Sequence, residues 1–174
     1  EISKTKSDNI IRNSNIPYTI LRPSNVFGAN MTNQSLFKLI DSIKKGFFFY
    51  LSRKNVLMNY VNVDDVTEAL ISCGNKKTAI GETYVLSQTI ELEKMKSIIC
   101  TSLQVEDRFL RVPEFPVRLI TKVLENMSSF PLTTQRINAL TGCCSYQSDK
   151  IIDDLFFEFK LSLEESFQLI VNQK

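Results

Sequence analysis

The chain contains no histidine, which removes the side chain that most often acts as a general base and most often binds metals. Acid and base chemistry would therefore depend on lysine, tyrosine, aspartate or glutamate. Lys4 is the first candidate, because a lysine ammonium can stabilise a nearby phenolate and so lower its pKa. Arg136 and Arg53 are candidates for phosphate recognition, since one guanidinium can donate two parallel hydrogen bonds to a phosphate.

The four cysteines are Cys73, Cys100, Cys143 and Cys144. They show no CxxC spacing and have no histidine to complete a ligand set, so we expect no metal site. A reduced, cytoplasmic chain is the expectation. We interpret the adjacent Cys143 and Cys144 as small buried apolar residues rather than as a redox pair.

Charge and hydropathy exclude two classes of partner. Lysine and arginine number 21 against 19 aspartates and glutamates, and the basic residues are scattered, so we expect no nucleic-acid partner. No run approaches the ~20 apolar residues of a membrane span. The longest aromatic block, residues 47–51, is flanked by Lys44, Lys45, Arg53 and Lys54, which leaves a membrane-surface or interaction patch as an alternative.

The 174 residues are 43% apolar and 23% charged, the composition of an ordinary globular protein. A chain of this length can bury roughly 70% of its unfolded surface, so it needs no disulfide or metal to hold a core. The first residue is Glu1 rather than methionine, and we expect the sequence to begin inside a longer protein.

The apolar spacing predicts strands that alternate with helices. We expect strands at residues 17–22, 47–51, 56–63, 83–86 and 108–112, and helices at 3–14, 33–45, 64–74 and 91–103. Asp64 is the predicted N-cap of the third helix. After Pro113 the pattern is helical, and a capping box that starts at Ser162 begins the last helix. This order predicts an α/β fold with largely parallel pairing and a helical tail.

Two early segments carry a family resemblance. Ser3-Lys4 opens a polar helix, and residues 17–28 read Pro-Tyr-Thr-Ile-Leu-Arg-Pro-Ser-Asn-Val-Phe-Gly. Together they resemble the extended short-chain dehydrogenase/reductases, which are NAD-dependent nucleotide-sugar epimerases and dehydratases. The second segment is similar to the strand and loop that end that family's cofactor half.

The resemblance implies roles for residues in both segments. In the family a catalytic tyrosine lies four residues before the lysine, one helical turn away, which here is immediately before Glu1. The lysine lowers the pKa of that phenol, whose ordinary value is near 10, and holds the nicotinamide ribose. By this correspondence Lys4 is catalytic and cofactor-binding, Arg22 and Pro23 lie beside the nicotinamide, and Asn25 contacts the substrate.

A third segment, residues 59–66, resembles the family's strand-to-helix signature V-x-V-x-D-V. The family usually has an arginine just before it, which pairs with the nucleotide diphosphate. This chain has Met58 there, and methionine offers no hydrogen-bond donor. Another arginine would have to hold the diphosphate, and Arg136 is our choice over Arg53. Arg136 lies in residues 131–140, which are similar to a stretch of epimerase-like proteins from surface-polysaccharide pathways.

The fourth segment, residues 145–157, resembles the family's closing segment, although Phe156 stands where glycine is usual. Phe49 is a candidate for stacking on the nucleotide base, and Leu36 for lining the same pocket. The resemblance covers nearly the whole chain. It lacks the glycine-rich dinucleotide fingerprint of the family's amino-terminal half.

The resemblance therefore implies the carboxy-terminal part of a Rossmann-like extended short-chain dehydrogenase/reductase. Residues 1–30 would end the dinucleotide-binding domain, and residues 31–174 would form the substrate lobe with an interleaved returning strand. The expected function is that of a partial nucleotide-sugar epimerase or dehydratase, an isomerase or oxidoreductase. NAD or NADP would be bound mainly by the other half, and the full-length protein would be a homodimer. The alternative is a truncated, non-catalytic chain or an interaction module.

Overall fold

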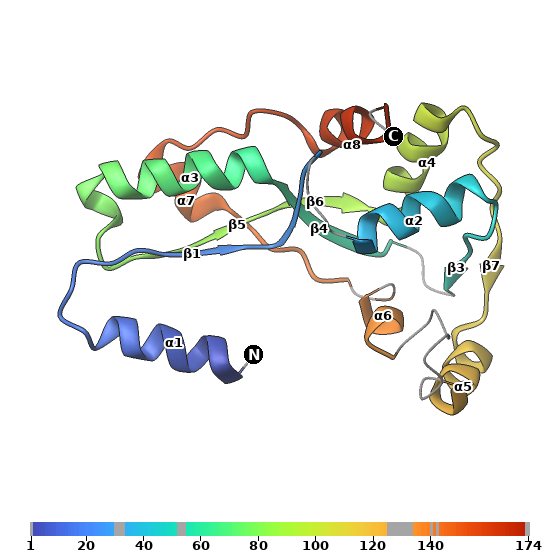
Figure 1. Ribbon diagram of the computed structural model, residues 1–174, viewed down its shortest axis with the longest axis horizontal. Helices are drawn as coiled ribbons and strands as arrows, with labels where there is room; N and C mark the ends of the chain where they lie inside the picture. Colours follow the sequence, from blue (N-terminus) through green and yellow to red (C-terminus); the bar gives the residue numbers. More distant parts are fainter. Residues whose placement is uncertain are drawn as a thin grey trace. The chain divides into compact units, whose positions relative to one another are not determined.

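The computed structural model describes residues 2–29, 34–51, 55–124, 134–139, 141 and 143–172 (Figure 1). The helices are α1 (Ile2–Arg12), α2 (Gln34–Lys44), α3 (Val63–Asn75), α4 (Leu92–Leu103), α5 (Glu114–Leu124), α6 (Thr134–Ala139), α7 (Asp149–Leu155) and α8 (Leu163–Asn172), with a 3-10 turn at Lys77–Ala79. The strands are β1 (Ile20–Pro23), β2 (Asn25–Phe27), β3 (Tyr50–Leu51), β4 (Leu57–Asn62), β5 (Thr83–Leu86), β6 (Gln88–Glu91) and β7 (Arg111–Val112). Among the described helices, none is both long and apolar enough to cross a membrane.

The chain forms two compact units, each built from several segments. Unit 1 contains residues 1–28, 59–88 and 146–163, and unit 2 contains residues 29–58, 89–145 and 164–174. The fold is the predicted α/β class, and the strand pairs β1–β5, β2–β4 and β3–β7 are parallel. The assignment of one domain to cofactor and the other to substrate stays a prediction.

The parallel pair β1–β5 forms the centre of unit 1, with Ile20 opposite Thr83 and Pro23 opposite Leu86. Tyr84 and Leu86 on β5 are fully buried, because they alternate toward a core that α3 and α7 supply. That core contains Val61, Ala69, Cys73, Ala79, Tyr84, Leu86, Ile151, Leu155 and Phe157. Figure 1 shows β1 and β5 running side by side.

The second parallel pair in unit 1 joins β2 to β4, with Asn25 opposite Tyr60 and Phe27 opposite Asn62. The rings of Phe27 and Tyr60 meet edge to face with centroids 5.7 Å apart. The sequence pattern did not indicate β2, because its three residues are too few to show an alternation. β6 was likewise not predicted, and it completes a sheet in the order β2-β4-β6.

The prediction that Asp64 caps α3 was wrong. The N-cap is Asn62, whose side-chain oxygen accepts a hydrogen bond from Asp64 N at 3.0 Å. Asp64 and Asp65 lie in the first helical turn, where their charge favours the positive end of the helix dipole. Asp65 is buried, and its Oδ1 accepts a hydrogen bond from Lys160 N at 2.9 Å. This bond ties the segment before α8 to the start of α3.

α1 contributes nothing to the core of unit 1. None of its residues is buried, and Ile2 and Ile10 are largely exposed. In Figure 1 the helix stands apart from the β1–β5 pair. Its described side-chain contacts are polar, and they include Arg12 to Thr83 Oγ1 at 2.6 Å.

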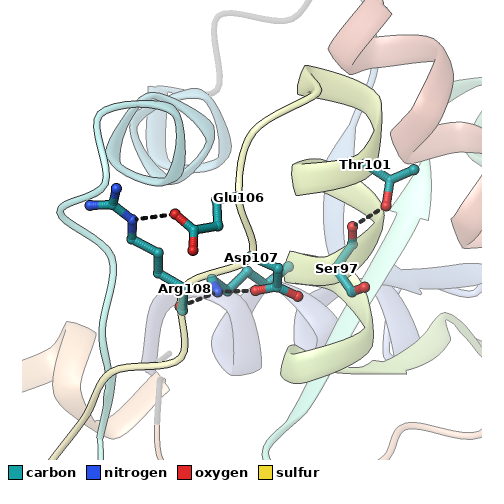
Figure 2. Close-up of polar contacts among 6 residues, drawn as sticks. Ser97, Thr101, Glu106, Asp107 and Arg108 are labelled. Carbon is teal, nitrogen blue, oxygen red and sulfur yellow. Dashed lines mark hydrogen bonds and ion pairs between the residues drawn. The ribbon is translucent and has the colours of Figure 1, made fainter.

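Unit 2 packs α2 on α4 and pairs β3 with β7. Lys96 on α4 is buried, its ammonium contacts the Asp107 carboxylate, and it donates a hydrogen bond to Arg108 O at 2.6 Å. Figure 2 shows Asp107 and Arg108 in this cluster. The Lys96 ammonium also lies 5.3 Å from the centre of the Tyr50 ring, and burial raises the pKa of that phenol. The loop before β7 is therefore held to α4 by a buried cation.

The cysteines correct a second prediction. Cys73 and Cys100 are buried, but Cys143 and Cys144 are both exposed. Their segment, residues 143–147, has no regular secondary structure and is exposed. The expected burial of the pair is wrong because no helix or strand carries it into a core.

Burial of Asp65 gives the first prediction, which concerns stability. Desolvation raises the pKa of Asp65 above its ordinary value of 3.8, so its ionisation in the folded state opposes folding. The folded state then binds a proton more strongly than the unfolded state, and this contribution to stability is lost as pH rises through the folded pKa. In urea unfolding at a series of pH values, Asp65→Asn should gain stability over the wild type as pH rises above 3.8.

Asp65→Ala removes the acceptor for Lys160 N, so it should be less stable than Asp65→Asn by about 1–2 kcal/mol. The matched control is Asp64→Asn, which changes an exposed charge in the same helical turn. An Asp65→Asn effect that does not vary with pH, or that equals the control, would contradict the prediction.

Candidate functional site

The carboxyl ends of β1 and β5 meet at one edge of unit 1. The register brings Pro23 opposite Leu86, and Ser24 N continues the pairing with a 3.0 Å hydrogen bond to Leu86 O. In open α/β sheets, ligands bind outside the carboxyl ends of parallel strands. This edge is therefore the place where the fold presents the residues predicted to act on a ligand.

Asp8 connects α1, the helix that carries Lys4, to the end of β1. Asp8 lies one helical turn after Lys4, on the same side of α1. The Asp8 carboxylate forms an ion pair with the Arg22 guanidinium at the end of β1. The ion pair therefore joins the helix that carries Lys4 to the end of β1. Nothing in the sequence pattern singled out Asp8.

Ser24 and Pro23 follow Arg22 directly. The Ser24 Oγ is buried yet forms no hydrogen bond within the described part of the chain. A buried hydroxyl without a partner is costly, so its position at the strand edge suits a polar ligand atom. Pro23 is exposed beside it.

Asn25 is oriented by β4. Its Nδ2 donates a hydrogen bond to Asn59 O at 2.9 Å, which leaves its side-chain oxygen directed away from that bond. Asn59 is itself buried, and its Oδ1 accepts a hydrogen bond from Tyr146 N at 3.1 Å. Asn59 therefore joins the Arg-Pro-Ser-Asn loop to the closing segment, a role that required the tertiary structure to find.

The closing segment is fixed to β5 by a reciprocal pair of bonds. Ser148 Oγ accepts from Ser87 N and donates to Ser87 O, both at 2.8 Å. Both serines are buried, so this pair satisfies polar groups that water does not reach. Residues 145–148 are thereby held beside the carboxyl end of β5.

Two tyrosines of unit 1 are poor candidates for a base. Burial raises the pKa of Tyr60 to about 12, and burial together with Asp154 raises the pKa of Tyr84 to about 12. The Tyr84 hydroxyl donates to Asp154 Oδ2 at 3.2 Å, which further favours its neutral form. Both phenols are core groups rather than acid-base groups.

The remaining predicted residues belong to unit 2. Leu36 is buried, and Phe49 is partly buried in the segment before β3. Arg136 lies on α6, but its side chain is outside the described residues, as is all of Arg53. Met58 is buried on β4 and acts as a core residue. The structure thus brings together Lys4, Arg22, Pro23 and Asn25 in one unit, and places the others in the second.

Solved structures share this fold. A nucleoside-diphosphate-sugar epimerase from Pseudomonas aeruginosa matches with a TM-score of 0.74 and 15% identity, over 98% of this chain and 52% of its own. UDP-glucose 4-epimerase from Thermotoga maritima, solved with UDP-glucose, matches with a TM-score of 0.65 and 17% identity, over 97% and 49%. A dTDP-glucose 4,6-dehydratase from Streptomyces venezuelae, solved with NAD, matches with a TM-score of 0.63 and 14% identity, over 95% and 46%.

The chain spans about half the length of these solved relatives. Comparison with curated proteins finds no significant match. The profile of the NAD dependent epimerase/dehydratase family matches residues 1–87, the half of the chain that contains Lys4, the Arg22 to Asn25 loop and the strand-to-helix signature. The strand pairing, the geometry at the ends of β1 and β5 and this match agree, and the chain belongs to the NAD-dependent epimerase/dehydratase family.

Proposed function

We propose that this chain is the carboxy-terminal part of a nucleotide-sugar epimerase or dehydratase, and that it supplies the lysine of the catalytic pair and the substrate lobe. The observation that carries the proposal is the Asp8–Arg22 ion pair, which links the helix of Lys4 to the loop that ends β1. The two motifs that match the family in sequence are therefore joined at a sheet edge suited to ligands.

Lys4, Arg22 and Pro23 are the residues that would meet a nicotinamide cofactor. The unpartnered Ser24 hydroxyl at the same edge fits a polar ligand there. NAD or NADP, when bound, would accept a hydride from a sugar carbon and return it. The groups that bind the dinucleotide phosphates belong to the other half of the enzyme, so this chain alone is not expected to hold the cofactor.

The chemical role of Lys4 is to act on a tyrosine that we place immediately before Glu1. A phenol with an ordinary pKa near 10 ionises poorly at neutral pH, and a neighbouring ammonium favours the phenolate. That phenolate would remove the sugar hydroxyl proton as the hydride leaves. Asp8 is a positioning residue, because it holds Arg22 next to α1.

The residues proposed to meet the substrate are those that the family resemblance indicates. Asn25 would bind the sugar through the side-chain oxygen that its bond to Asn59 O leaves available. Phe49 would stack on the nucleotide base, and Leu36 would line the same pocket. Because Met58 is a buried core residue and offers no donor, Arg136 would hold the diphosphate.

Replacing Lys4 tests the catalytic role in the full-length protein. Lys4→Met should lower kcat by about 100-fold or more while leaving nucleotide-sugar affinity nearly unchanged, since the ammonium acts on the phenol pKa. The matched control is Lys6→Met, another exposed lysine on α1, which should retain wild-type turnover. Steady-state kinetics across pH is the measurement. Equal activity of the two variants would remove Lys4 from the reaction and favour a non-catalytic chain.

Replacing Asn25 tests whether its side chain contacts the substrate. Asn25→Ala should raise KM for the nucleotide sugar by about tenfold, the effect of losing roughly one hydrogen bond, with little change in NAD affinity. Asn13→Ala, an exposed asparagine after α1, is the control and should leave both unchanged. Calorimetric titration separates the two ligands. A loss of both affinities in Asn25→Ala would point to a local folding defect instead.

Replacing Arg136 tests whether this arginine holds the nucleotide diphosphate. Arg136→Ala should weaken binding of the nucleoside diphosphate by about 1.5–3 kcal/mol, the range for a hydrogen bond to a charged group, and should leave NAD affinity nearly untouched. Arg108→Ala, an exposed arginine of the same unit, is the control. No loss with Arg136→Ala would make Arg136 a surface residue and favour a substrate without a diphosphate.

A further inference from the structure

Unit 2 exposes large apolar side chains that no part of the proposed reaction uses. Three lie on α5, where Phe115 is 80% exposed, Leu119 59% and Ile120 52%. Phe109 and Leu110, just before β7, and Phe47, just before β3, are also exposed. We call these six residues the α5 surface. Scattered exposed apolar residues are ordinary, but here five fall within residues 109–120.

One side of α5 is anchored to the rest of unit 2. Its exposed apolar side chains therefore lie on a helix that is packed in place. Thr121 is fully buried, and Arg118 binds both Glu114 Oε1 at 2.6 Å and Asn138 Oδ1 at 2.9 Å. Phe115 and Leu119 are four residues apart and therefore share the opposite, exposed side. α5 therefore has one anchored face and one exposed apolar face.

The β3–β7 pair places the turn that carries Phe47 beside the segment that carries Phe109. Tyr50 lies opposite Arg111, and Tyr50 N donates to Leu110 O at 2.8 Å. A methyl group added at Gly46 would lie 3.9 Å from Arg108 Nη1, so the turn after α2 lies against residue 108. Figure 2 shows the Arg108 side chain extended, with its guanidinium next to Glu106. The turn that carries Phe47 and the segment that carries Phe109 are neighbours.

Among the described residues around the α5 surface, the carboxylates are paired with cations whereas several lysines are not paired with carboxylates. Its carboxylates are already paired: Glu106 with Arg108, Asp107 with Lys96, and Glu114 with Arg118. Lys44 and Lys45 at the end of α2 and Lys122 on α5 are exposed and form no salt bridge within the described ranges. An unpaired lysine near a surface favours an anionic lipid headgroup by about 1 kcal/mol.

We propose that the α5 surface docks on the face of an anionic lipid bilayer. Phenylalanine and leucine would enter the boundary between headgroups and acyl chains, and lysines on long stems would reach the phosphates. A bilayer fits better than a protein partner because the lysines border the apolar side chains and their charge is not matched by local carboxylates. The inference needs no membrane span and does not depend on the proposed reaction.

The test is sedimentation of the full-length protein with vesicles. Vesicles of equal parts phosphatidylglycerol and phosphatidylcholine should bind the protein, vesicles of phosphatidylcholine alone should bind it much less, and added salt should release it. The double variant Phe115→Ser and Leu119→Ser should partition at least about tenfold more weakly, since two exposed apolar side chains are lost. Lys122→Glu should weaken binding and flatten its salt dependence.

The control is the double variant Phe156→Ser and Leu169→Ser, which removes the same residue types at similar exposure, 86% and 50%, outside the α5 surface. It should bind vesicles like the wild type. Circular dichroism and turnover of the nucleotide sugar in solution check that each variant is folded, so a failure here is separable from a failure of the proposed reaction. Absent binding to anionic vesicles, or equal loss in both double variants, overturns the proposal. A change of oligomeric state in the α5 variant with unaltered vesicle binding would assign the surface to a second copy and overturn it too.

Discussion

Parallel pairing of β1 with β5 is the constraint on which the rest of the chain depends. Two parallel strands cannot be joined by a tight turn, so the chain must leave the sheet and return in the same direction. Residues 24–82 form the connection between β1 and β5. A large part of this connection folds into unit 2 before α3 packs on the strands. The same requirement explains why β1 and β5 lie in two separate segments of unit 1. The loop that begins at Ser24 is both the exit from β1 and the edge where a ligand would bind.

Buried polar contacts then fix the segments that the core does not hold. Asp65 accepts from Lys160 N, Asn59 accepts from Tyr146 N, and Ser148 exchanges two bonds with Ser87. Each bond joins residues distant in sequence, and each satisfies a group that burial would otherwise leave unpaired. Lys96 does the same in unit 2, where its ammonium holds the loop before β7. These contacts fix the positions of loops, and ligands would be bound at loops.

The two proposals rest on different kinds of exposed side chain in the two units. In unit 1 the exposed groups of interest are polar and gather where β1 and β5 end, with Arg22 and Asp8 at the side of α1. In unit 2 they are aromatic and aliphatic, and lysines border them. Chemistry on a nucleotide sugar needs the first kind of surface, and attachment to a lipid face needs the second.

The sequence by itself determined the α/β class, the strand at residues 83–86 and the helices near 34–44 and 92–103, because the helices repeat apolar residues at helical spacing and the strand is a short apolar run. It also determined the family, since the string around Arg22 and Pro23 is specific in order as well as in composition. β2 and β6 were not predicted, because β2 has only three residues and Ile90 is the one apolar residue of β6. Asp64 was mistaken for the N-cap of α3 because Asn62, two residues earlier, offers an equally good acceptor.

Only the tertiary structure decided which polar residues meet. Asp8 binds Arg22, and Asn59 links Asn25 to Tyr146, although nothing in local spacing joins these positions. It also decided that Cys143 and Cys144 are exposed, and that Phe115 and Leu119 face outward while Thr121 is buried. An apolar stripe on a helix predicts a buried face, and which face is buried depends on what packs against it. The physical reason is that burial and hydrogen-bond partners are properties of segments far apart in the chain, which periodicity within one segment does not record.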